Sequence, residues 1–398
     1  MSLPASIPES IPESIYARAR PLLERLVSFD TVSHHSNLPL IAWVEEHLAG
    51  LGVASRRIVS RDGRKSNLLA SVGPDEKGGV VLSGHTDVVP VVGQEWRTDP
   101  FVVAEDAGKL YGRGVADMKG FLALALAAVP KFLAADLKRP AHLAFSYDEE
   151  IGCFGAPGMI EVIGRELPRP ALVVVGEPTS MEVVSAHKGI TAWRVTVTGR
   201  EAHSAQTHLG VSANMVAARL MGELVRIADD LVATADPASP FTPKGASLTI
   251  GKVEGGTAGN ILAKRCAFLF DLRAPSGLDV RAALASFLAL AEQLDAEIKA
   301  KAPEGGVLVE QLADVPPLAP DASGVAEARV RRLAGDNGPA RVASFASEAG
   351  QFQGAGFPTV LCGPGSIDQA HQPDEFIEIA QLQRGAEFMA RLIEELRA

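Results

Sequence analysis

Cysteine is scarce in this sequence, and the few cysteines form neither a metal-binding nor a disulfide pattern. Cys153, Cys266 and Cys362 are widely spaced and odd in number among 398 residues. No pair has the C-x-x-C spacing of a zinc knuckle, and an odd number of thiols fits a reducing compartment. We therefore expect three reduced thiols that act as small buried hydrophobic side chains, and a cytoplasmic protein.

Basic clusters and long apolar runs are missing as well. The formal net charge is -10 and no local basic patch offsets it, so neither nucleic acid nor a membrane is expected as a partner. The most apolar window, residues 121–133, is too short to cross a bilayer and contains Pro130. Residues 1–15 lack the basic-then-apolar order of a secretory signal and are expected to form a flexible lead-in. A hydrophobic content of 47% nevertheless predicts folded domains with substantial cores.

Helical and strand patterns alternate along both ends of the chain. Apolar residues recur at helical spacing over 15–28, 39–51, 119–134, 156–163 and 380–396, and short apolar runs predict strands at 67–72, 79–83, 141–147, 171–175 and 359–361. This alternation predicts an α/β domain with a mostly parallel sheet flanked by helices. Polar residues gather where these strands end, which predicts a site at the carboxyl ends of the sheet.

The pattern changes after His187. Strands are predicted at 190–197, 246–253, 267–273 and 307–315, with helices at 212–231 and 279–294. The order βαββαβ predicts a ferredoxin-like α+β domain, and Pro316 and Pro317 mark the return to the first pattern. We therefore expect a discontinuous catalytic domain, residues 1–187 and 317–398, and an inserted domain, residues 188–316.

Metal-binding side chains follow the predicted strands. Imidazole and carboxylate groups without thiolate suit zinc, cobalt or manganese. Three ionised carboxylates around one dication would leave a buried excess of negative charge, whereas two dications leave one positive charge that a hydroxide cancels. The sequence therefore favours two ions, although each residue alone could be a core histidine, a helix N-cap or a turn residue. The residues are His85, Asp87, Asp117, Glu149, Glu150, Glu177 and His371.

The motifs that hold these residues resemble those of the M20 family of metallopeptidases and amidohydrolases, in order and over nearly the whole chain. The resemblance implies an enzyme that hydrolyses the N-acyl amide of a small-molecule N-acyl amino acid, first of all N-acetyl-L-ornithine, a step of arginine biosynthesis. It also implies zinc, or cobalt, as the two ions. The motifs are Ser83–Pro90, Gly112–Gly120, Asp148–Cys153, Gly176–Thr179 and Gly363–Glu375.

The resemblance also assigns metal ligands. Asp117 would bridge the two ions. His85 and Glu177 would complete one site, and Glu150 and His371 the other.

Two neighbours of the ligands receive roles in the reaction by the same resemblance. Asp87 would fix the imidazole tautomer of the histidine two residues before it. Glu149 would be the general base, which takes a proton from the attacking water and passes it to the departing amine. The family also leads us to expect a cis peptide between Asp117 and Met118.

The inserted domain holds a second group of residues, namely His203, Asn260 and Arg273. In the resembled family this domain is a lid that forms a homodimer, here through residues 188–316. His203 would reach the partner subunit's site and stabilise the tetrahedral oxyanion, while Asn260 and Arg273 would hold the substrate, with Arg273 on its α-carboxylate. A loop histidine and a strand-end arginine without function are the alternative.

Substrate choice within the family stays open. Glu348 could receive a side-chain ammonium such as that of ornithine, or it could be a surface carboxylate. Gln351 precedes Phe352 where related desuccinylases carry an arginine, so a second substrate carboxylate is less expected. The alternatives are desuccinylation of N-acyl-diaminopimelate, broad deacylation of N-acyl amino acids, dipeptide hydrolysis, and an inactive metal-binding scaffold. A nucleotide site is disfavoured because no complete phosphate-binding loop motif is present.

Overall fold

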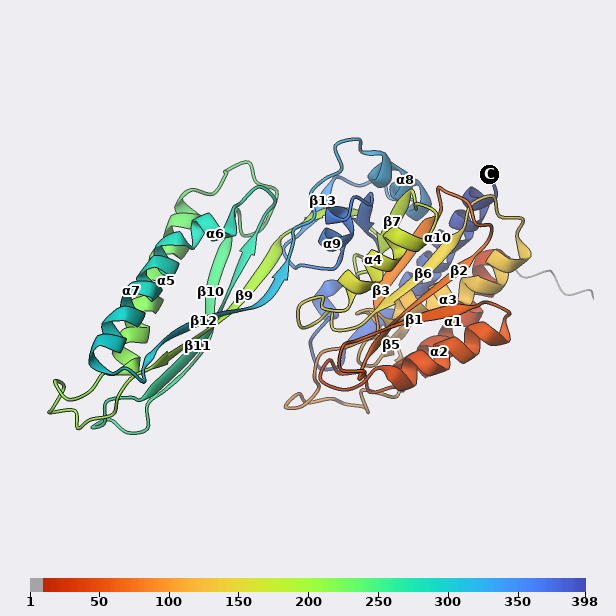
Figure 1. Cartoon of the computed structure of the whole chain (residues 1–398). Coiled ribbons are helices and arrows are strands. Elements are labelled where there is room, and N and C mark those ends of the chain that lie inside the picture. The colour runs from red at the N-terminus through yellow and green to blue at the C-terminus, as the bar shows by residue number, and fades with distance from the viewer. Residues whose placement is uncertain (1–9) are drawn as a thin grey trace, which may run out of the picture. The chain divides into compact units, whose positions relative to one another are not determined.

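The computed structural model describes residues 10–398, which form two compact units (Figure 1). Unit 1 comprises residues 10–186, 320–341 and 347–398, and unit 2 comprises residues 187–319 and 342–346. The sequence placed the domain boundaries after residues 187 and 316. The catalytic, lid and dimerisation roles that it gave to the two parts stay predictions.

Unit 1 is built on an eight-stranded mixed sheet whose central strands run parallel. Every residue of β3 and β6 is buried, as expected for strands covered by helices on both faces. Parallel pairing joins β6, β3, β7 and β14. Antiparallel pairing joins β1 to β2, β2 to β6, and β8 to β14. The order is β1 (Ser55–Val59), β2 (Ser66–Val72), β6 (Ala141–Ser146), β3 (Val80–His85), β7 (Leu172–Val175), β14 (Thr359–Leu361), β8 (Val184–His187) and β13 (Arg341–Ala343).

Helices pack on this sheet and confirm the predicted α/β class. The central helix, α3, is buried along most of its length because most of its residues are alanine, leucine and phenylalanine. No helix among residues 10–398 is both long and apolar enough to span a membrane. One core joins the sheet to α1 (Ile11–Val27), α2 (Leu38–Gly50), α3 (Lys119–Ala134), α8 (Val325–Ala334) and α10 (Ile379–Arg397); α4 (Ala156–Glu166) and α9 (Ala349–Gly354) also contact it.

Short elements in the loops of unit 1 lie outside this sheet. They are the three-stranded sheet β15 (Phe376–Glu378), β5 (Lys109–Tyr111) and β4 (Ala104–Asp106), and the 3-10 turn η1 (Ile367–Gln369). Their three-residue length gives no periodicity, so the sequence did not predict them.

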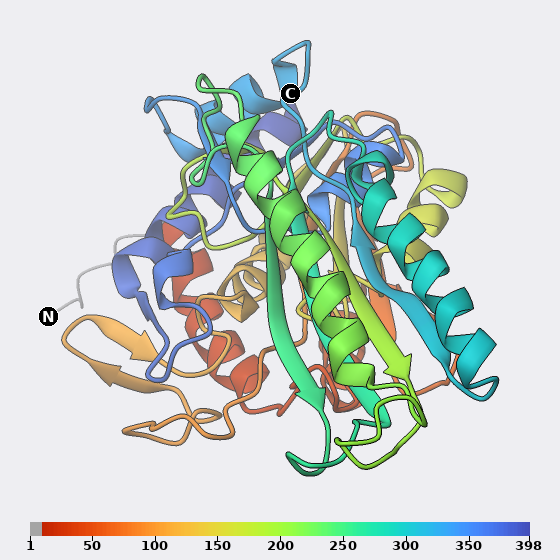
Figure 2. The same cartoon turned by 90° about the vertical axis from the view of Figure 1, so that its left-hand side faces the viewer.

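Unit 2 is an antiparallel sheet with two helices on one face, as Figure 2 shows. Buried and half-exposed residues alternate along β9, and its buried side packs against the apolar side of the helices. With strands numbered along the chain the spatial order is 4-1-3-2, the ferredoxin-like arrangement that the order βαββαβ predicted. The strands are β10 (Ser247–Gly255), β11 (Arg265–Ala274), β9 (Gly189–Thr198) and β12 (Gly306–Val315), and the helices α5 (Ala213–Ala233) and α7 (Ala285–Lys301).

Two predicted boundaries were wrong. Helix α1 begins at Ile11, within the expected lead-in, because Ser10 and Glu13 form a capping box; residues 1–9 lie outside the described part of the chain. The helix predicted over 279–294 is two helices, α6 (Val280–Ala283) and α7, with Asp279 capping the first through Ala282 N at 3.0 Å.

Candidate functional site

The predicted metal ligands of unit 1 converge at the carboxyl ends of the parallel strands. His85 ends β3, Glu150 follows β6 and Glu177 follows β7, so three neighbouring strands deliver three side chains to one edge. Ligand atoms of His85, Asp117 and Glu150 lie within 4.8 Å of one another, as do those of His85, Glu149 and Glu177. The structure therefore offers two overlapping groups of donors that share one histidine.

Asp117 lies between the two histidines of the cluster. Its Oδ1 lies 3.1 Å from His85 Nε2, and its Oδ2 lies 3.5 Å from His371 Nε2. The same His371 nitrogen lies 3.0 Å from Glu150 Oε2. This central place agrees with a bridging ligand, and the peptide that follows, Asp117–Met118, is cis as the resemblance led us to expect.

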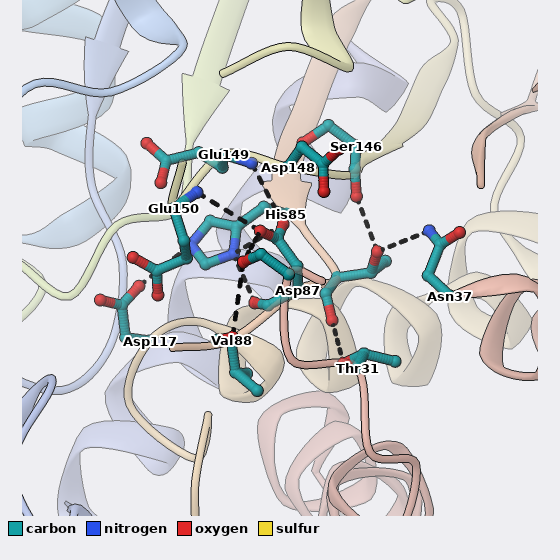
Figure 3. Close-up of polar contacts among 12 residues, drawn as sticks. Thr31, Asn37, His85, Asp87, Val88, Asp117, Ser146, Asp148, Glu149 and Glu150 are labelled. Carbon is teal, nitrogen blue, oxygen red and sulfur yellow. Dashed lines mark hydrogen bonds and ion pairs between the residues drawn. The ribbon is translucent and has the colours of Figure 1, made fainter. Parts of the chain in front are cut away.

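The tautomer of His85 is set by Asp87 through the backbone. Nδ1 of His85 lies 2.8 Å from the backbone carbonyl oxygen of Asp87 and 3.7 Å from its carboxylate (Figure 3). A carbonyl only accepts, so Nδ1 carries the hydrogen and Nε2 is the nitrogen available to a metal. The contact that could orient the imidazole therefore comes from the main chain of Asp87.

The carboxylates of this cluster carry more negative charge than the side chains around them offset. Burial and the neighbouring carboxylates raise the pKa of Glu150 to about 7 and hold the pKa values of Glu149 and Glu177 well above the usual range. Glu177 Oε1 is buried and accepts no hydrogen bond from any residue in the described part of the chain. A buried carboxylate oxygen without a partner is costly unless a cation meets it.

The histidines respond in the opposite direction. Hydrogen bonds to Asp117 and Glu150 raise the pKa of His371 to about 10, and contacts with Asp117 and Glu149 outweigh burial to raise the pKa of His85. Protons on imidazole are what divalent cations displace when they bind. The oxygen and nitrogen donors therefore fit a divalent metal of the zinc or cobalt type.

The loop that carries Asp117 is held by a buried carboxylate that the sequence did not single out. Glu375 accepts hydrogen bonds from Arg113 Nη1 at 2.8 Å and from the backbone amides of Gly114, Ala116 and Asp117 at 2.9 to 3.1 Å. The side chains of Arg113 and Glu375 are each 1% exposed. Both residues lie within the motifs described above, but only the fold shows that they meet.

The turn that carries Glu149 and Glu150 is fixed by the carboxylate of Asp87. Its Oδ1 accepts a hydrogen bond from Glu149 N at 3.2 Å, and its Oδ2 accepts one from Glu150 N at 3.3 Å (Figure 3). Behind the turn, Cys153 N donates to Glu149 O at 3.0 Å. The two adjacent glutamates are thus held by their backbone while their side chains face the donor cluster.

Glu348 is neither exposed nor free in this structure. It is 1% exposed, and its two carboxylate oxygens accept hydrogen bonds from Ser83 and Ser146, both at 2.6 Å. It therefore joins the ends of β3 and β6, which carry the ligand His85 and the turn of Glu149. A substrate ammonium would have to reach the acceptor positions that these serines leave open on a buried carboxylate, or exchange one of the serines.

The site residues of unit 2 fall into two places. His203 and Asn260 lie on adjoining loops, where Ser204 N donates to Asn260 O at 2.9 Å. Arg273 lies near the other end of β11, opposite Ile190 of β9, while Arg265 at the start of β11 lies opposite Thr198. The eight residue steps of strand between them span roughly 26 Å, so one copy of unit 2 does not gather all three residues around one small molecule.

A model of the peptidase family M20/M25/M40 matches residues 81–395. The chain belongs to this family. It is 34% identical to an acetylornithine deacetylase of Proteus mirabilis over 367 residues, an alignment that covers 92% of each chain. It is also 32% identical over 370 residues to an acetylornithine deacetylase of Pasteurella multocida, covering 92% of this chain and 93% of the relative. As an M20 metallohydrolase with such relatives, the protein is an enzyme that hydrolyses a linear amide.

Solved structures of M20 proteins share the fold. An M20 metallo-carboxypeptidase of Sulfolobus solfataricus superimposes with a TM-score of 0.76 at 18% identity, over 95% of this chain and 99% of that one. A Bacillus subtilis protein described as a dinuclear metal binding peptidase of the M20 family gives a TM-score of 0.63 at 14% identity, over 95% and 97%. At these identities the likeness concerns the fold alone.

Proposed function

We propose that this M20 enzyme hydrolyses N-acetyl-L-ornithine to L-ornithine and acetate with two divalent ions, zinc or cobalt. The observation that carries the proposal is the convergence of His85, Asp117, Glu150, Glu177 and His371, with Glu149 beside them. The substrate is supported by the two relatives named acetylornithine deacetylase, which match over nearly the whole chain.

We assign the ligands to the two ions by the pattern of the family. Asp117 would bridge them, His85 and Glu177 would hold one, and Glu150 and His371 the other. When bound, such ions lower the pKa of water and polarise the carbonyl of the scissile amide.

Glu149 would move the proton. Its carboxylate lies with His85 and Glu177 in one donor group, so a water molecule between them would be within its reach. Glu149 would take the proton from this water and deliver it to the nitrogen of the departing amine. Burial raises the pKa of Glu149, and a carboxylate with a higher pKa is a stronger base.

The separation within unit 2 supports a homodimer. Arg273 would bind the α-carboxylate of the substrate, and His203 and Asn260 would act on the same substrate from the partner subunit, with His203 on the oxyanion. Because about 26 Å of strand lies between the two groups, a shared substrate would need them from different chains.

A substrate panel tests the proposal. The protein is stripped with a chelator, reloaded with zinc or cobalt, and assayed on acetylornithine, acetylmethionine, succinyl-diaminopimelate and a dipeptide. We expect acetylornithine to have the highest kcat/KM with either metal, and the chelated protein to be inactive. A higher kcat/KM on another member of the panel would replace acetylornithine, and equal activity before and after chelation would reject the metal mechanism.

The setting of the reaction is part of the proposal. Release of ornithine from its acetyl derivative belongs to arginine biosynthesis. A cytoplasmic location is supported by the cysteines, all three of which are buried free thiols.

A further inference from the structure

Lys65 binds the residue that precedes the general base. It stands between β1 and β2, where its backbone exchanges hydrogen bonds with Ser60 at 2.9 and 3.0 Å. Its ammonium group donates to the carboxylate of Asp148 and to the backbone carbonyl of Ser33. The side chains of Lys65 and Asp148 are only 13% and 14% exposed, so this ion pair is shielded more than a surface pair.

Asp148 needs such a partner because of its backbone. Its φ of +56° lies in the left-handed region, which aspartate tolerates better than most residues other than glycine but still adopts at a cost, so contacts that hold it there stabilise the turn. This conformation turns the chain at the end of β6, so that Glu149 and Glu150 follow on the side of the metal ligands. The contact with Lys65 fixes the residue at which the chain turns.

Ser33 connects the same lysine to the other side of the turn. While its carbonyl accepts from Lys65, its hydroxyl donates to Asp87 Oδ2 at 2.7 Å. Asp87 in turn accepts from the amides of Glu149 and Glu150. The contacts therefore close a ring from Lys65 through Asp148, Glu149, Asp87 and Ser33 back to Lys65.

We propose that Lys65 is a positioning residue for the reaction, which holds the backbone of Glu149 from outside the metal centre by closing this ring. It contacts none of the metal ligands directly. Glu150 lies on the same turn, but bound ions would hold its side chain in the metal-loaded protein, so we expect the effect there on the base and not on metal content. The inference rests on the proposed role of Glu149. A displacement of a catalytic group by about 1 Å can reduce turnover a hundredfold, so loosening this turn is expected to lower kcat.

The test uses the metal-loaded full-length protein and the best substrate of the panel. We expect Lys65→Met to lower kcat at least about tenfold while KM changes less than about twofold, because the base is misplaced and the substrate contacts are kept. Lys65→Arg, which retains a cation, should recover most of the lost kcat. Since Lys65 acts through Asp148, the double variant Lys65→Met with Asp148→Asn should lose no more than Lys65→Met alone.

Arg64→Met is the matched control, because it removes an exposed cation from the same loop, one residue away. It should leave kcat unchanged. An equal loss in both variants, a metal content that falls together with activity, or purely additive losses in the double variant would overturn the proposal.

Hydrogen exchange separates this proposal from the proposed function. Four backbone amides donate hydrogen bonds within the turn, those of Gly152, Cys153, Phe154 and Gly155. The amide exchange rate of peptides over residues 147–155 should therefore rise in Lys65→Met and stay the same in Arg64→Met. Unchanged exchange in Lys65→Met would reject the positioning role. This measurement needs no substrate, so it stands even if the protein turns over none of the panel.

Discussion

Arg113 Nη1 donates to Glu375 Oε2 across 2.8 Å in a part of the interior where neither side chain reaches solvent. The pair joins the loop of Asp117, the proposed bridging ligand, to the segment that carries His371. Trp96 covers the guanidinium, with its ring centroid 4.9 Å from the Arg113 Cζ atom. Two segments more than 250 residues apart are thus fixed to each other next to the proposed metal centre.

Removing the cation of this pair should destabilise the fold. Arg113→Met leaves the Glu375 carboxylate buried without its counter-charge, for which we expect a loss of about 3 to 5 kcal/mol in the free energy of unfolding. Urea unfolding of the chelated proteins measures it. The control is Arg165→Met, which breaks the exposed pair with Glu161 and should cost less than about 1 kcal/mol. Equal losses in the two variants would show that burial of the Arg113 pair adds nothing.

Glu149→Gln tests the general base. Since acid and base catalysis is typically worth about a hundred- to ten-thousandfold, kcat should fall by that range while bound metal, measured by elemental analysis, is unchanged. Activity that survives without a large fall in kcat would refute the proton-transfer step proposed for this residue.

Glu177→Gln should have effects of opposite sign with and without metal. In the chelated protein the change replaces a carboxylate, whose charged form burial and the neighbouring Glu149 and Asp117 disfavour, by a neutral amide, so the free energy of unfolding should rise by about 1 to 3 kcal/mol. In the presence of zinc the variant should bind less metal and gain less stability from it than the unchanged protein. Thermal unfolding with and without zinc measures both; a variant that is destabilised in chelator would contradict the charge imbalance described above.

Glu348→Gln distinguishes two roles on two substrates. If the carboxylate only joins β3 to β6 through Ser83 and Ser146, kcat/KM should fall by the same factor on acetylornithine and acetylmethionine. If it exchanges a serine for the ammonium of ornithine, the loss should be confined to acetylornithine. From its two short hydrogen bonds we expect equal losses.

His142 should make the protein sensitive to acid. Burial lowers its pKa from 6.5 to about 4, so the folded state stays neutral where the unfolded state binds a proton. The stability that depends on a neutral His142 is complete above about pH 6.5. As the pH falls towards 4, the free energy of unfolding decreases by up to about 3 kcal/mol. His142→Asn, which can still bond to Ser71 Oγ, should reduce this slope in urea midpoints at pH 7 and pH 5. His187, whose pKa is also lowered to about 4, would keep part of the slope, and an unchanged slope would contradict the assignment to His142.

The sequence pointed to side chains near the ends of strands, and the fold brings these side chains together. His85, Glu150 and Glu177 could be picked out because polar residues at or shortly after the end of a buried apolar strand stand out. Ser33 and Lys65 could not be found in this way, because they lie on loops. Their partners, two carboxylates and a backbone carbonyl, are brought near only by the fold. Asp87 was expected to fix the tautomer of His85, and only the fold shows that its carboxylate also accepts from two backbone amides.

The length of β11 has a consequence for the genetics of this enzyme. If His203 serves the active site of the partner subunit, then a chain with Glu149→Gln and a chain with His203→Ala are each inactive as homodimers, but a mixed dimer contains one site in which both residues are intact. In cells that lack the enzyme, the two defective genes expressed together should then restore growth without arginine, although neither gene does so alone. One strand separating Arg273 from Asn260 would thus make each chain dependent on a second copy of itself.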